Sequence, residues 1–461
     1  MKKIRLLLVL TIATGIFISF TNADNNEKPV YIPPSEQRNG DAAKGYDYLI
    51  NGDYIKSGVP YGYFTLLNGK NKANVLDRTG KNATVGPDFT VVTAPNGVEI
   101  VAPNCLQCHG DMFEGKYYVG LGNTSSADFS NISSQDNFKN NAALKIMKTV
   151  SPKQYEAAST VIRSFNAISP LMESEVRGVN VADRLAALLV AHRDPVTLEW
   201  RDTPLLQIPA EVIPTDVPAW WLLRKKNAMF YNGFGRGDFA QFMMLSNILT
   251  TKDTAEAREV SQHFGDVLAY IKTIEPPKYP KPINYELAKE GEQVFLYNCS
   301  YCHGTYGKDA SYPNFLVPLS AIQTDSALLT ANHQNPQFRE WFNKSWFAQG
   351  NNPAQLVPSH GYVAPPLDGV WITAPYLHNG SVPTIEALLN SKLRPRYWQR
   401  DFDKPVYDYE KLGWVYEEKA TPVKKKTYNT TIPGYGNNGH TFGDPLTDKE
   451  RKAVIEYLKT L

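Results

Sequence analysis

Apolar positions towards the C-terminal end of the chain recur at helical spacing in two stretches. In YELAKEGEQVFLYNCSYCHG, Gly291, Phe295 and Cys299 lie four positions apart and therefore share one face of a predicted helix. At the C-terminus, LTDKERKAVIEYLKTL offers Thr447 as a helix cap with Glu450 three residues later, and an apolar stripe follows. A small residue and an aromatic ring on the first helix predict that it packs closely against another helix.

The last helix has a twin earlier in the chain. VLAYIKTI, residues 267–274, matches VIEYLKTL, residues 454–461, in character along its length. After the first copy, EPPKYPKP contains prolines that end the helix and predict a stiff, extended linker over residues 275–285. The chain is therefore expected to consist of two units, 24–274 and 286–461, each closed by a similar helix.

The N-terminal unit contains additional chain before its first cysteine pair. A helix is predicted near Ala42–Leu49, but about fifty residues separate it from Cys105. Residues 60–101 combine β-forming runs with turn signals such as Pro95-Asn96-Gly97, which predicts a small β-rich insertion. Because the chain also has 32 prolines and 31 glycines, we predict a mainly α fold with long ordered loops around this insertion.

The first 23 residues have the layout of a secretory signal peptide. Lys2, Lys3 and Arg5 give a positive start, Leu6–Phe20 is an uncharged and mostly apolar run, and small residues lead to a cleavage point after Ala23. An uncleaved membrane anchor is the alternative, but the run is shorter than the ~20 residues of a membrane span. We therefore expect an exported, periplasmic protein without stable membrane insertion after cleavage.

Length and charge narrow the size class and the partners. The 461 residues fit two or three domains at the usual ~100–200 residues each. The chain carries 48 Lys and Arg side chains against 46 Asp and Glu side chains, so its charge is nearly balanced. Nucleic acid is therefore not an expected partner, because binding a polyanion would call for an excess of basic residues.

Every cysteine of the chain belongs to one of two CxxCH motifs, PNCLQCHG and NCSYCHG. Their cysteines and histidines are Cys105, Cys108, His109, Cys299, Cys302 and His303. A disulfide between cysteines three residues apart would close a very small loop and leave the histidines unexplained. A thioredoxin-type dithiol needs no histidine in the fifth place. A four-cysteine zinc site would have to join pairs that lie 194 residues apart.

Covalently bound haem c uses all three side chains of each motif. The two thiols add to the porphyrin vinyl groups, and the adjacent imidazole lies under the iron as proximal ligand. His109 and His303 are therefore the predicted proximal ligands of two haem c groups, one in each of two tandem cytochrome c-like domains. The β-rich insertion is expected to pack over the first haem.

Two haem c units in one exported chain resemble the bacterial di-haem cytochrome c peroxidase superfamily, whose relatives include the rubber oxygenases. The resemblance is carried by PPLDGVWITAPYLHNGSVPTIEALL, Pro365–Leu389, with an Ala-Pro-Tyr-x-His-Asn-Gly core typical of the second haem domain. It covers most of residues 40–461. A Gly-His-x-Phe-Gly segment, Gly439–Gly443, makes the chain more similar to the rubber-oxygenase branch than to the typical peroxidases.

For the second haem, the resemblance implies a second axial ligand. The peroxidases use a methionine about fourteen residues beyond the motif histidine; here Lys392 has that position, and no methionine follows Phe347. In the rubber-oxygenase branch the ligand is the histidine of the Gly-His-x-Phe-Gly segment, which corresponds to His440. The implied axial pair is thus His303 and His440, the alternative being that His440 is a surface residue. His378 of the motif is the rival ligand, with a structural role expected for it.

The first haem has fewer candidates for a second ligand. After His109 its unit contains only His192, before a predicted helix end, and His263, on the closing helix. Both histidines are expected to be structural. The methionines of the unit remain as candidates, although methionine in such stretches usually fills a core. We therefore expect an open or water-bound sixth position, where peroxide or dioxygen could bind.

The stretch DVPAWWLLRKKNAMFYNGFGRGD resembles a segment that supplies aromatic residues near the open haem of the rubber oxygenases. Trp220, Trp221 and Phe230 are the corresponding candidates for walls of the haem pocket or for an electron path between haems. The alternative is that they are core aromatics. The basic run 224–226 either meets haem propionates or forms a solvated face.

Two functions fit these features. In the first, the protein is an oxidoreductase whose N-terminal haem acts on peroxide or dioxygen while the C-terminal haem transfers electrons; the sequence identifies no distal acid or base for it. In the second, both irons are six-coordinate and the protein is a low-potential, non-catalytic electron carrier. Both functions need a redox partner protein. The resemblance also allows a calcium ion between the domains, for which the sequence shows no motif.

Overall fold

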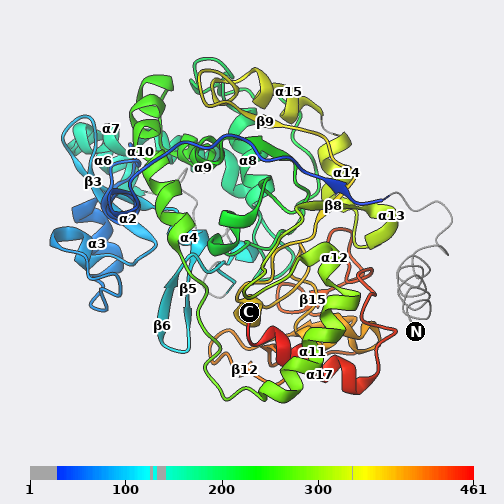
Figure 1. Cartoon of the computed structure of the whole chain (residues 1–461). Coiled ribbons are helices and arrows are strands. Elements are labelled where there is room, and N and C mark those ends of the chain that lie inside the picture. The colour runs from blue at the N-terminus through cyan, green and yellow to red at the C-terminus, as the bar shows by residue number, and fades with distance from the viewer. Residues whose placement is uncertain (1–27, 125–127, 132–141, 335) are drawn as a thin grey trace, which may run out of the picture.

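The computed structural model describes residues 28–124, 128–131, 142–334 and 336–461 (Figure 1). The predicted signal peptide, residues 1–23, lies outside this part of the chain. In chain order, the α-helices are α2 (Ala42–Asn51), α3 (Tyr61–Asn68), α4 (Leu106–His109), α6 (Ala142–Val150), α7 (Pro152–Ile168), α8 (Ala182–Ala191), α9 (Phe239–Met243), α10 (Thr254–Thr273), α11 (Tyr285–Asn298), α12 (Ser300–His303), α13 (Leu319–Ile322), α14 (Ala327–Gln334), α15 (Pro336–Lys344), α16 (Ile385–Leu389) and α17 (Asp448–Leu458).

The strands are short and form several small sheets. They are β1 (Val30–Tyr31), β2 (Val59–Pro60), β3 (Phe89–Thr93), β4 (Glu99–Pro103), β5 (Gly110–Phe113), β6 (Lys116–Val119), β7 (Gly235–Gly237), β8 (Phe315–Pro318), β9 (Ala354–Leu356), β10 (Gly361–Val363), β11 (Tyr397–Gln399), β12 (Tyr407–Asp408), β13 (Gly413–Trp414), β14 (Glu417–Glu418) and β15 (Tyr428–Asn429). Within the described ranges each sheet has two or three strands. Helices and long loops therefore build most of the fold.

Two helix pairs lie on opposite sides of the molecule, α2 with α10 and α11 with α17 (Figure 1). Each pair makes its closest approach at a glycine. A Cβ on Gly45 would collide with the carbonyl oxygen of Asp266 in α10, and a Cβ on Gly291 would collide with that of Ala453 in α17. Gly291 and Phe295 are both buried, which confirms the predicted contact face of α11. The twin closing helices thus make equivalent contacts.

The ends of these helices follow the sequence signals. The hydroxyl of Thr447 accepts a hydrogen bond from the backbone N–H of Glu450, and the carboxylate of Glu450 accepts one from the backbone N–H of Thr447. This reciprocal pair confirms the predicted cap of α17. Between α10 and α11, residues 274–284 form neither helix nor strand, as the proline-rich sequence predicts.

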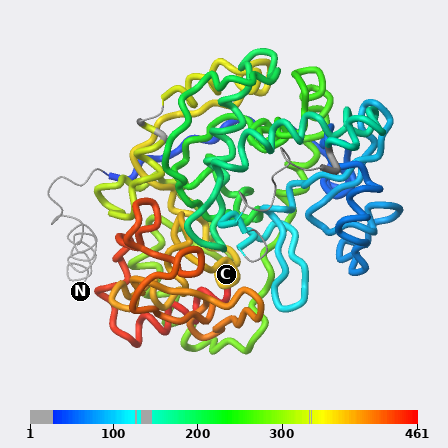
Figure 2. Tube along the Cα trace, turned by 180° about the vertical axis from the view of Figure 1, so that it is seen from behind, coloured from blue at the N-terminus to red at the C-terminus, as the bar shows by residue number. Residues whose placement is uncertain are grey.

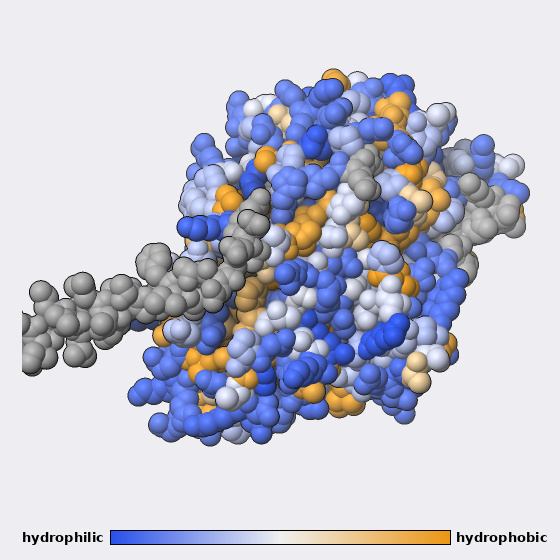
Figure 3. Space-filling model, turned by 90° about the vertical axis from the view of Figure 1, so that its right-hand side faces the viewer, coloured by the Kyte–Doolittle hydropathy of each residue, from blue (hydrophilic) through white to orange (hydrophobic). Residues whose placement is uncertain are grey.

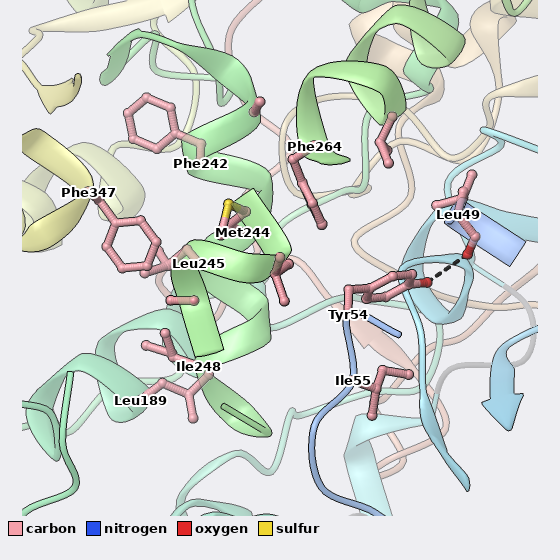
Figure 4. Close-up of a cluster of buried hydrophobic side chains, with 14 of the residues drawn as sticks. Leu49, Tyr54, Ile55, Leu189, Phe242, Met244, Leu245, Ile248, Phe264 and Phe347 are labelled. Carbon is pink, nitrogen blue, oxygen red and sulfur yellow. Dashed lines mark hydrogen bonds between the residues drawn. The ribbon is translucent and has the colours of Figure 1, made fainter. Parts of the chain in front are cut away.

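The packing of the chain crosses the predicted boundary between the two units. Strand β1, at the start of the described chain, pairs with β8, and β7 pairs with β9. Phe342 of α15 stacks between Phe242 and Phe347, with ring centroids 5.1 and 5.8 Å apart. Figure 4 shows Phe347 beside Phe242 in this core, and Figure 2 shows the same segments running side by side. The division at 275–285 separates two stretches of sequence, but the core joins them.

The insertion before the first CxxCH motif is only partly a sheet. Strands β3 and β4 form a hairpin around the predicted turn, in which Gly97 has a left-handed φ of 80°, and β2 adds to β4. Residues 61–68, expected to be β-rich, instead form helix α3. The hairpin β5–β6, directly after the motif, was not predicted.

Apolar side chains gather into two large buried clusters, one around α2, α8, α9 and α10 and one around α11, α16 and α17. Figure 4 shows part of the first, where the hydroxyl of Tyr54 donates to the carbonyl of Leu49 at 2.7 Å. On the face seen in Figure 3, apolar residues form small groups among hydrophilic ones. None of the helices in the described ranges is both long enough and apolar enough to cross a membrane.

Candidate functional site

The two CxxCH motifs share a short helical turn and one backbone hydrogen bond. In each, the histidine lies at the end of a single helical turn, α4 or α12, and its N–H donates to the carbonyl of the first cysteine. The N···O distance is 3.1 Å from His109 to Cys105 and 3.0 Å from His303 to Cys299. This turn keeps the two thiols and the imidazole of each motif close together. It is the arrangement that covalent haem attachment requires.

The state of the cysteines disfavours the other interpretations of the motifs. All four are free of disulfides. Burial raises the pKa of Cys105 and Cys299 to about 12 and that of Cys302 to about 11. A dithiol catalyst needs a lowered thiol pKa, since the thiolate is the nucleophile. Across residues 28–124, 128–131, 142–334 and 336–461, no group of three or more His, Cys, Asp or Glu side chains is placed to hold a metal ion.

At the second motif, a second histidine faces the first. The ring centroids of His303 and His440 are 6.1 Å apart, with the planes 59° to one another. Two metal–imidazole bonds of about 2.0–2.1 Å each, added to the depth of the two rings, would give about 6 Å. The Nδ1–H of His303 donates to the carbonyl of Pro365 at 2.8 Å, which leaves Nε2 as the free nitrogen. The residues therefore fit an iron between the two rings.

Both imidazoles of this pair are neutral at ordinary pH, as metal ligands must be. Burial lowers the pKa of His303, although its hydrogen bond to Pro365 opposes the shift. Burial also lowers the pKa of His440 to about 3, with smaller contributions from His303 and Arg394. A neutral imidazole has a lone pair to offer a metal.

The rival ligand, His378, has Tyr362 and Asp216 as its partners. Its ring stacks on Tyr362 with centroids 4.3 Å apart, and its Nε2 lies 3.3 Å from the Tyr362 hydroxyl. The His378 carbonyl accepts from the N–H of Asp216 at 2.7 Å. Burial lowers the pKa of this histidine to about 3. These contacts connect His378 to neighbouring segments of the protein.

At the first motif, His109 has an indole beside it. The rings of His109 and Trp220 are 4.6 Å apart and nearly parallel, at 18°. Trp220 covers the flat face of the imidazole, whereas a ring nitrogen forms its bond in the plane of the ring. The indole therefore does not block a bond from that nitrogen to a metal. The Nδ1 atom of His109 is buried and has no hydrogen-bond partner among the described residues. His109 thus lacks the carbonyl contact that orients His303.

The remaining histidines of the first unit have other partners. His192 ends α8, where its Nδ1 lies 2.9 Å from the carbonyl oxygen of Arg201 and its ring stacks on Trp200 at 4.6 Å. His263, on α10, stacks on Tyr48 at 4.4 Å. These contacts give both histidines structural roles.

Trp221, next to the indole that flanks His109, reaches towards the second motif. Its Nε1–H donates to the carbonyl of Asp368 at 2.8 Å, three residues after Pro365. Trp220 belongs to the first buried cluster and Trp221 to the second. Two adjacent residues of the 3₁₀ helix η5 (Trp220–Lys225) therefore connect the surroundings of the two motifs.

Phe230 is farther from the centre of this arrangement. It lies in a loop with a left-handed φ of 68°, and the residue is 41% exposed. Its ring meets Phe242 edge-on, with centroids 5.6 Å apart. Trp220 and Trp221 therefore lie near the two motifs, whereas Phe230 lies at the border of the first buried cluster.

The basic run 224–226 divides into paired and unpaired cations. Arg224 forms an ion pair with Glu275, and the Nζ of Lys225 lies 2.7 Å from the carboxylate of Asp368. Lys226 has no side-chain partner within the described ranges, and burial lowers its pKa to about 8. Lys226 is half-buried, so an anionic partner would offset the partial loss of water around its charge.

Sequence reasoning missed two polar residues near the first motif. The side-chain amide of Asn180 donates to the sulfur of Cys108 at 3.4 Å. One turn later, in the first turn of α8, burial raises the pKa of Asp183 to about 6. No motif marks either residue, because Asn180 contacts a cysteine that is distant in sequence and the pKa of Asp183 depends on its burial in the fold.

Comparisons with known proteins bear on the C-terminal half of this site. Residues 361–399, which include Pro365 and His378, match the family described as RoxA-like, cytochrome c-like. An uncharacterized protein of Sinorhizobium fredii, y4iM, is 27% identical over 298 residues, or 55% of this chain and 66% of that protein. A second uncharacterized protein of that organism, y4iJ, is 41% identical over 163 residues, or 32% of this chain and 25% of that protein.

The chain thus spans just under two thirds of the first relative and a quarter of the second. The match to residues 361–399 supports a relationship to RoxA-like cytochromes c. A cytochrome c-like domain implies covalently bound haem c, for which CxxCH motifs supply the attachment residues. Placement in the wider peroxidase superfamily, the number of haems and a calcium ion stay predictions.

Proposed function

We propose that the protein is an exported di-haem c-type cytochrome with oxidoreductase activity, whose N-terminal haem acts on peroxide or dioxygen and whose C-terminal haem transfers electrons. One contrast carries the proposal. His303 faces a second histidine, His440, at the spacing of two axial ligands, whereas the ring beside His109 is that of Trp220. An iron closed on both sides can pass electrons only, while an iron with one free position can also bind a small oxidant.

Haem c, when bound, supplies a redox-active iron, and the chain supplies its attachment and surroundings. The four thiols tether the porphyrins. The carbonyl of Pro365 fixes the orientation of His303 and leaves its Nε2 free, so that this nitrogen would hold the iron. Trp220 holds the ring of His109 from the side. A redox partner protein would deliver or remove electrons.

Trp220 and Trp221 are the proposed link between the two haems. Trp220 touches the proximal ligand of the first, and Trp221 is bonded to the segment that orients the proximal ligand of the second. The two indoles belong to consecutive residues, so covalent bonds join them and the path needs few steps through space. We assign them the path for electrons rather than the wall over the open iron.

Lys226 is the proposed partner of a haem propionate. Arg224 and Lys225 are neutralised by acidic side chains, so they have less need of a further anion. Lys226 lies directly after η5, is half-buried, and has no protein partner for its ammonium group in the described ranges. A propionate would supply the missing negative charge.

Binding of exogenous ligands to the purified holoprotein tests the proposal. Haem content is measured first, and two haem c groups per chain are expected. Visible and EPR spectra are then recorded for the oxidised and half-reduced forms, with and without cyanide or CO. We expect one haem to bind the added ligand and the other to stay low-spin. If neither haem binds a ligand in either state, the enzyme function fails and the protein is an electron carrier.

A further inference from the structure

The loop that presents His440 is held by polar side chains from three other segments of the chain. We propose that Arg394, Asn379 and Asp325 form a clamp that positions His440 as the second ligand of the C-terminal haem. The inference rests on the proposed function, because it takes His440 to be a ligand. It also assigns a purpose to two polar residues of the matched segment 361–399.

Arg394 binds the end of the loop that contains the histidine. Its Nη1 donates to the carbonyls of Asn437 at 2.7 Å and Gly439 at 2.6 Å, and its Nη2 donates to the carbonyl of His440 at 3.0 Å. The other donors bind two carbonyls of α16, at 3.1 and 3.0 Å. One guanidinium thus ties α16 to the loop through five hydrogen bonds.

The use of arginine at this position follows from its shape. All five acceptors are backbone carbonyls, two from α16 and three from the loop. The planar guanidinium carries five N–H donors in fixed directions, one for each carbonyl. A lysine would keep the charge but would offer a single nitrogen. The contacts therefore select for geometry as well as for charge.

Asn379 and Asp325 bind the other end of the loop. The side-chain amide of Asn379, fully buried, donates to the carbonyls of Gly434 at 3.0 Å and Gly436 at 2.9 Å. One carboxylate oxygen of Asp325 accepts from the N–H groups of the same two glycines, both at 3.0 Å. Residues 434–436 are thus bound through both their donors and their acceptors.

The clamp acts on a backbone that would not keep its conformation unaided. Gly439 has a φ of 74°, and His440 has a φ of 44°, a left-handed conformation that residues with a side chain rarely adopt. The N–H of His440 also donates to the carbonyl of Ile322 at 2.8 Å. With the loop held at both ends, the imidazole points at His303. Without the clamp, we expect the loop to relax and the ring to turn away.

The test compares Arg394→Gln with a matched control, Arg396→Gln, in the full-length holoprotein. Arg396 is two residues away and exposed, and its side chain lies over Tyr397 rather than on the loop. Both substitutions remove one positive charge. The readouts are the low-spin signal of the second haem in EPR and visible spectra, its binding of CO when reduced, and its response to added imidazole.

We expect Arg394→Gln to shift the equilibrium between bound and detached His440 about tenfold or more towards the detached form, because five hydrogen bonds from a charged donor are lost. The second haem then gains high-spin signal, binds CO and returns to low-spin when imidazole is added. Arg394→Lys is expected to recover only part of the ligation. Arg396→Gln should leave every readout unchanged.

His440→Ala separates failure of this inference from failure of the proposed ligation. If His440→Ala leaves the second haem low-spin, His440 is not the ligand and the proposed function is wrong at that point. If His440→Ala opens the haem but Arg394→Gln does not, the clamp is refuted while the ligand assignment stands. Full recovery in Arg394→Lys would also overturn the clamp, since charge alone would then suffice.

A second variant keeps the test decisive if Arg394→Gln yields no holoprotein. Asn379→Ala removes only the contacts at the far end of the loop, and Arg394→Lys keeps the charge of the clamp. Either variant should show a partial gain of CO binding at the second haem, reversed by imidazole. Wild-type spectra in both variants would refute the proposal.

Discussion

His109 and His303 begin from the same backbone turn, yet their surroundings differ on every side. His303 is oriented by the carbonyl of Pro365 and faces His440. His440 lies on a loop that hydrogen bonds hold at both ends. His109 has an unpaired Nδ1 within the described ranges and is braced by the face of Trp220. In the proposed function, a motif therefore sets how haem is attached, while segments far away in sequence decide what each haem does.

The largest expected effect comes from removing the attachment residues of one motif at a time. Replacing both cysteines of a motif by serine prevents thioether formation, because a hydroxyl does not take the place of the thiol. Cys105→Ser with Cys108→Ser should leave one haem per chain with the spectrum of a closed, low-spin site. Cys299→Ser with Cys302→Ser should leave one haem that binds cyanide.

Haem content per chain and spin state are the measurements. Loss of both haems in either double variant would show that the two sites depend on each other for folding. The same spectrum from both remaining haems would remove the contrast between the sites.

The two helix pairs can be compared through their glycines. Gly45→Ala and Gly291→Ala each place a Cβ against a backbone carbonyl of the facing helix, and we expect each to lower the free energy of unfolding by about 1–3 kcal/mol. Gly62→Ala is the matched control, since a Cβ there meets nothing within 4 Å. It should stabilise α3 by about 0.5–1 kcal/mol.

Denaturant unfolding followed by the haem bands and by circular dichroism measures these values. Equal losses for Gly45 and Gly291 would support equivalent helix pairs. A neutral result at either glycine contradicts the contact described for that pair.

A pH-dependent stability should come from Asp183 in the first turn of α8. Burial raises the pKa of Asp183 to about 6 in the folded protein, above its ordinary value of 3.8. The folded state therefore binds more protons than the unfolded state between about pH 4 and pH 6, and stability falls as pH rises through this window.

Asp183→Asn removes this dependence. It should raise the free energy of unfolding by about 1–3 kcal/mol at pH 7 and have little effect below pH 4. Unfolding at the two pH values, with Asp309→Asn as an exposed control, gives the comparison. Equal effects of Asp183→Asn at both pH values would place its carboxylate in an ordinary aqueous environment.

The smallest expected effect concerns the indole that braces His109. Trp220→Leu removes the stacked ring but keeps an apolar side chain, and an aromatic contact contributes about 0.5–1.5 kcal/mol. The affinity of the first haem for cyanide should change by about three- to tenfold, with the low-spin spectrum of the second haem unchanged. Trp220→Phe should recover most of the wild-type affinity. A changed second haem with an unchanged first haem would contradict the position given to Trp220.

Much of the framework follows from local sequence signals. Each of these features depends on residues that are close to one another in the chain. They are the glycine of α11, the cap of α17, the segment 267–274 that resembles residues 454–461, and the linker between the helix pairs. Residues 61–68 show the limit of such signals, because a run rich in aromatics is typical of strands but forms helix α3 here. The strand propensity of single residues is small, and packing against the surrounding fold can outweigh it.

The residues of the candidate site could be named from the sequence more easily than their arrangement. The CxxCH motifs can be recognised from their spacing alone, whereas His440 was predicted only from the resemblance to the rubber-oxygenase branch. The clamp could not be found at all, since Arg394 and Asn379 bind backbone carbonyls, and every residue type has a carbonyl to offer. Asn180 was missed for a different reason, because its partner, the sulfur of Cys108, lies 72 residues earlier.

The pairing of β1 with β8 has a consequence for how the chain is made. Val30 and Tyr31 meet partners at Leu316 and Phe315, so the first described strand must wait until more than two thirds of the chain has been synthesised. The core beside Phe242 waits still longer, for Phe342 and Phe347. Cys105 and Cys108 are therefore expected to remain accessible for most of this period. The machinery that attaches haem would meet the first motif on an unfinished fold and the second only shortly before closure.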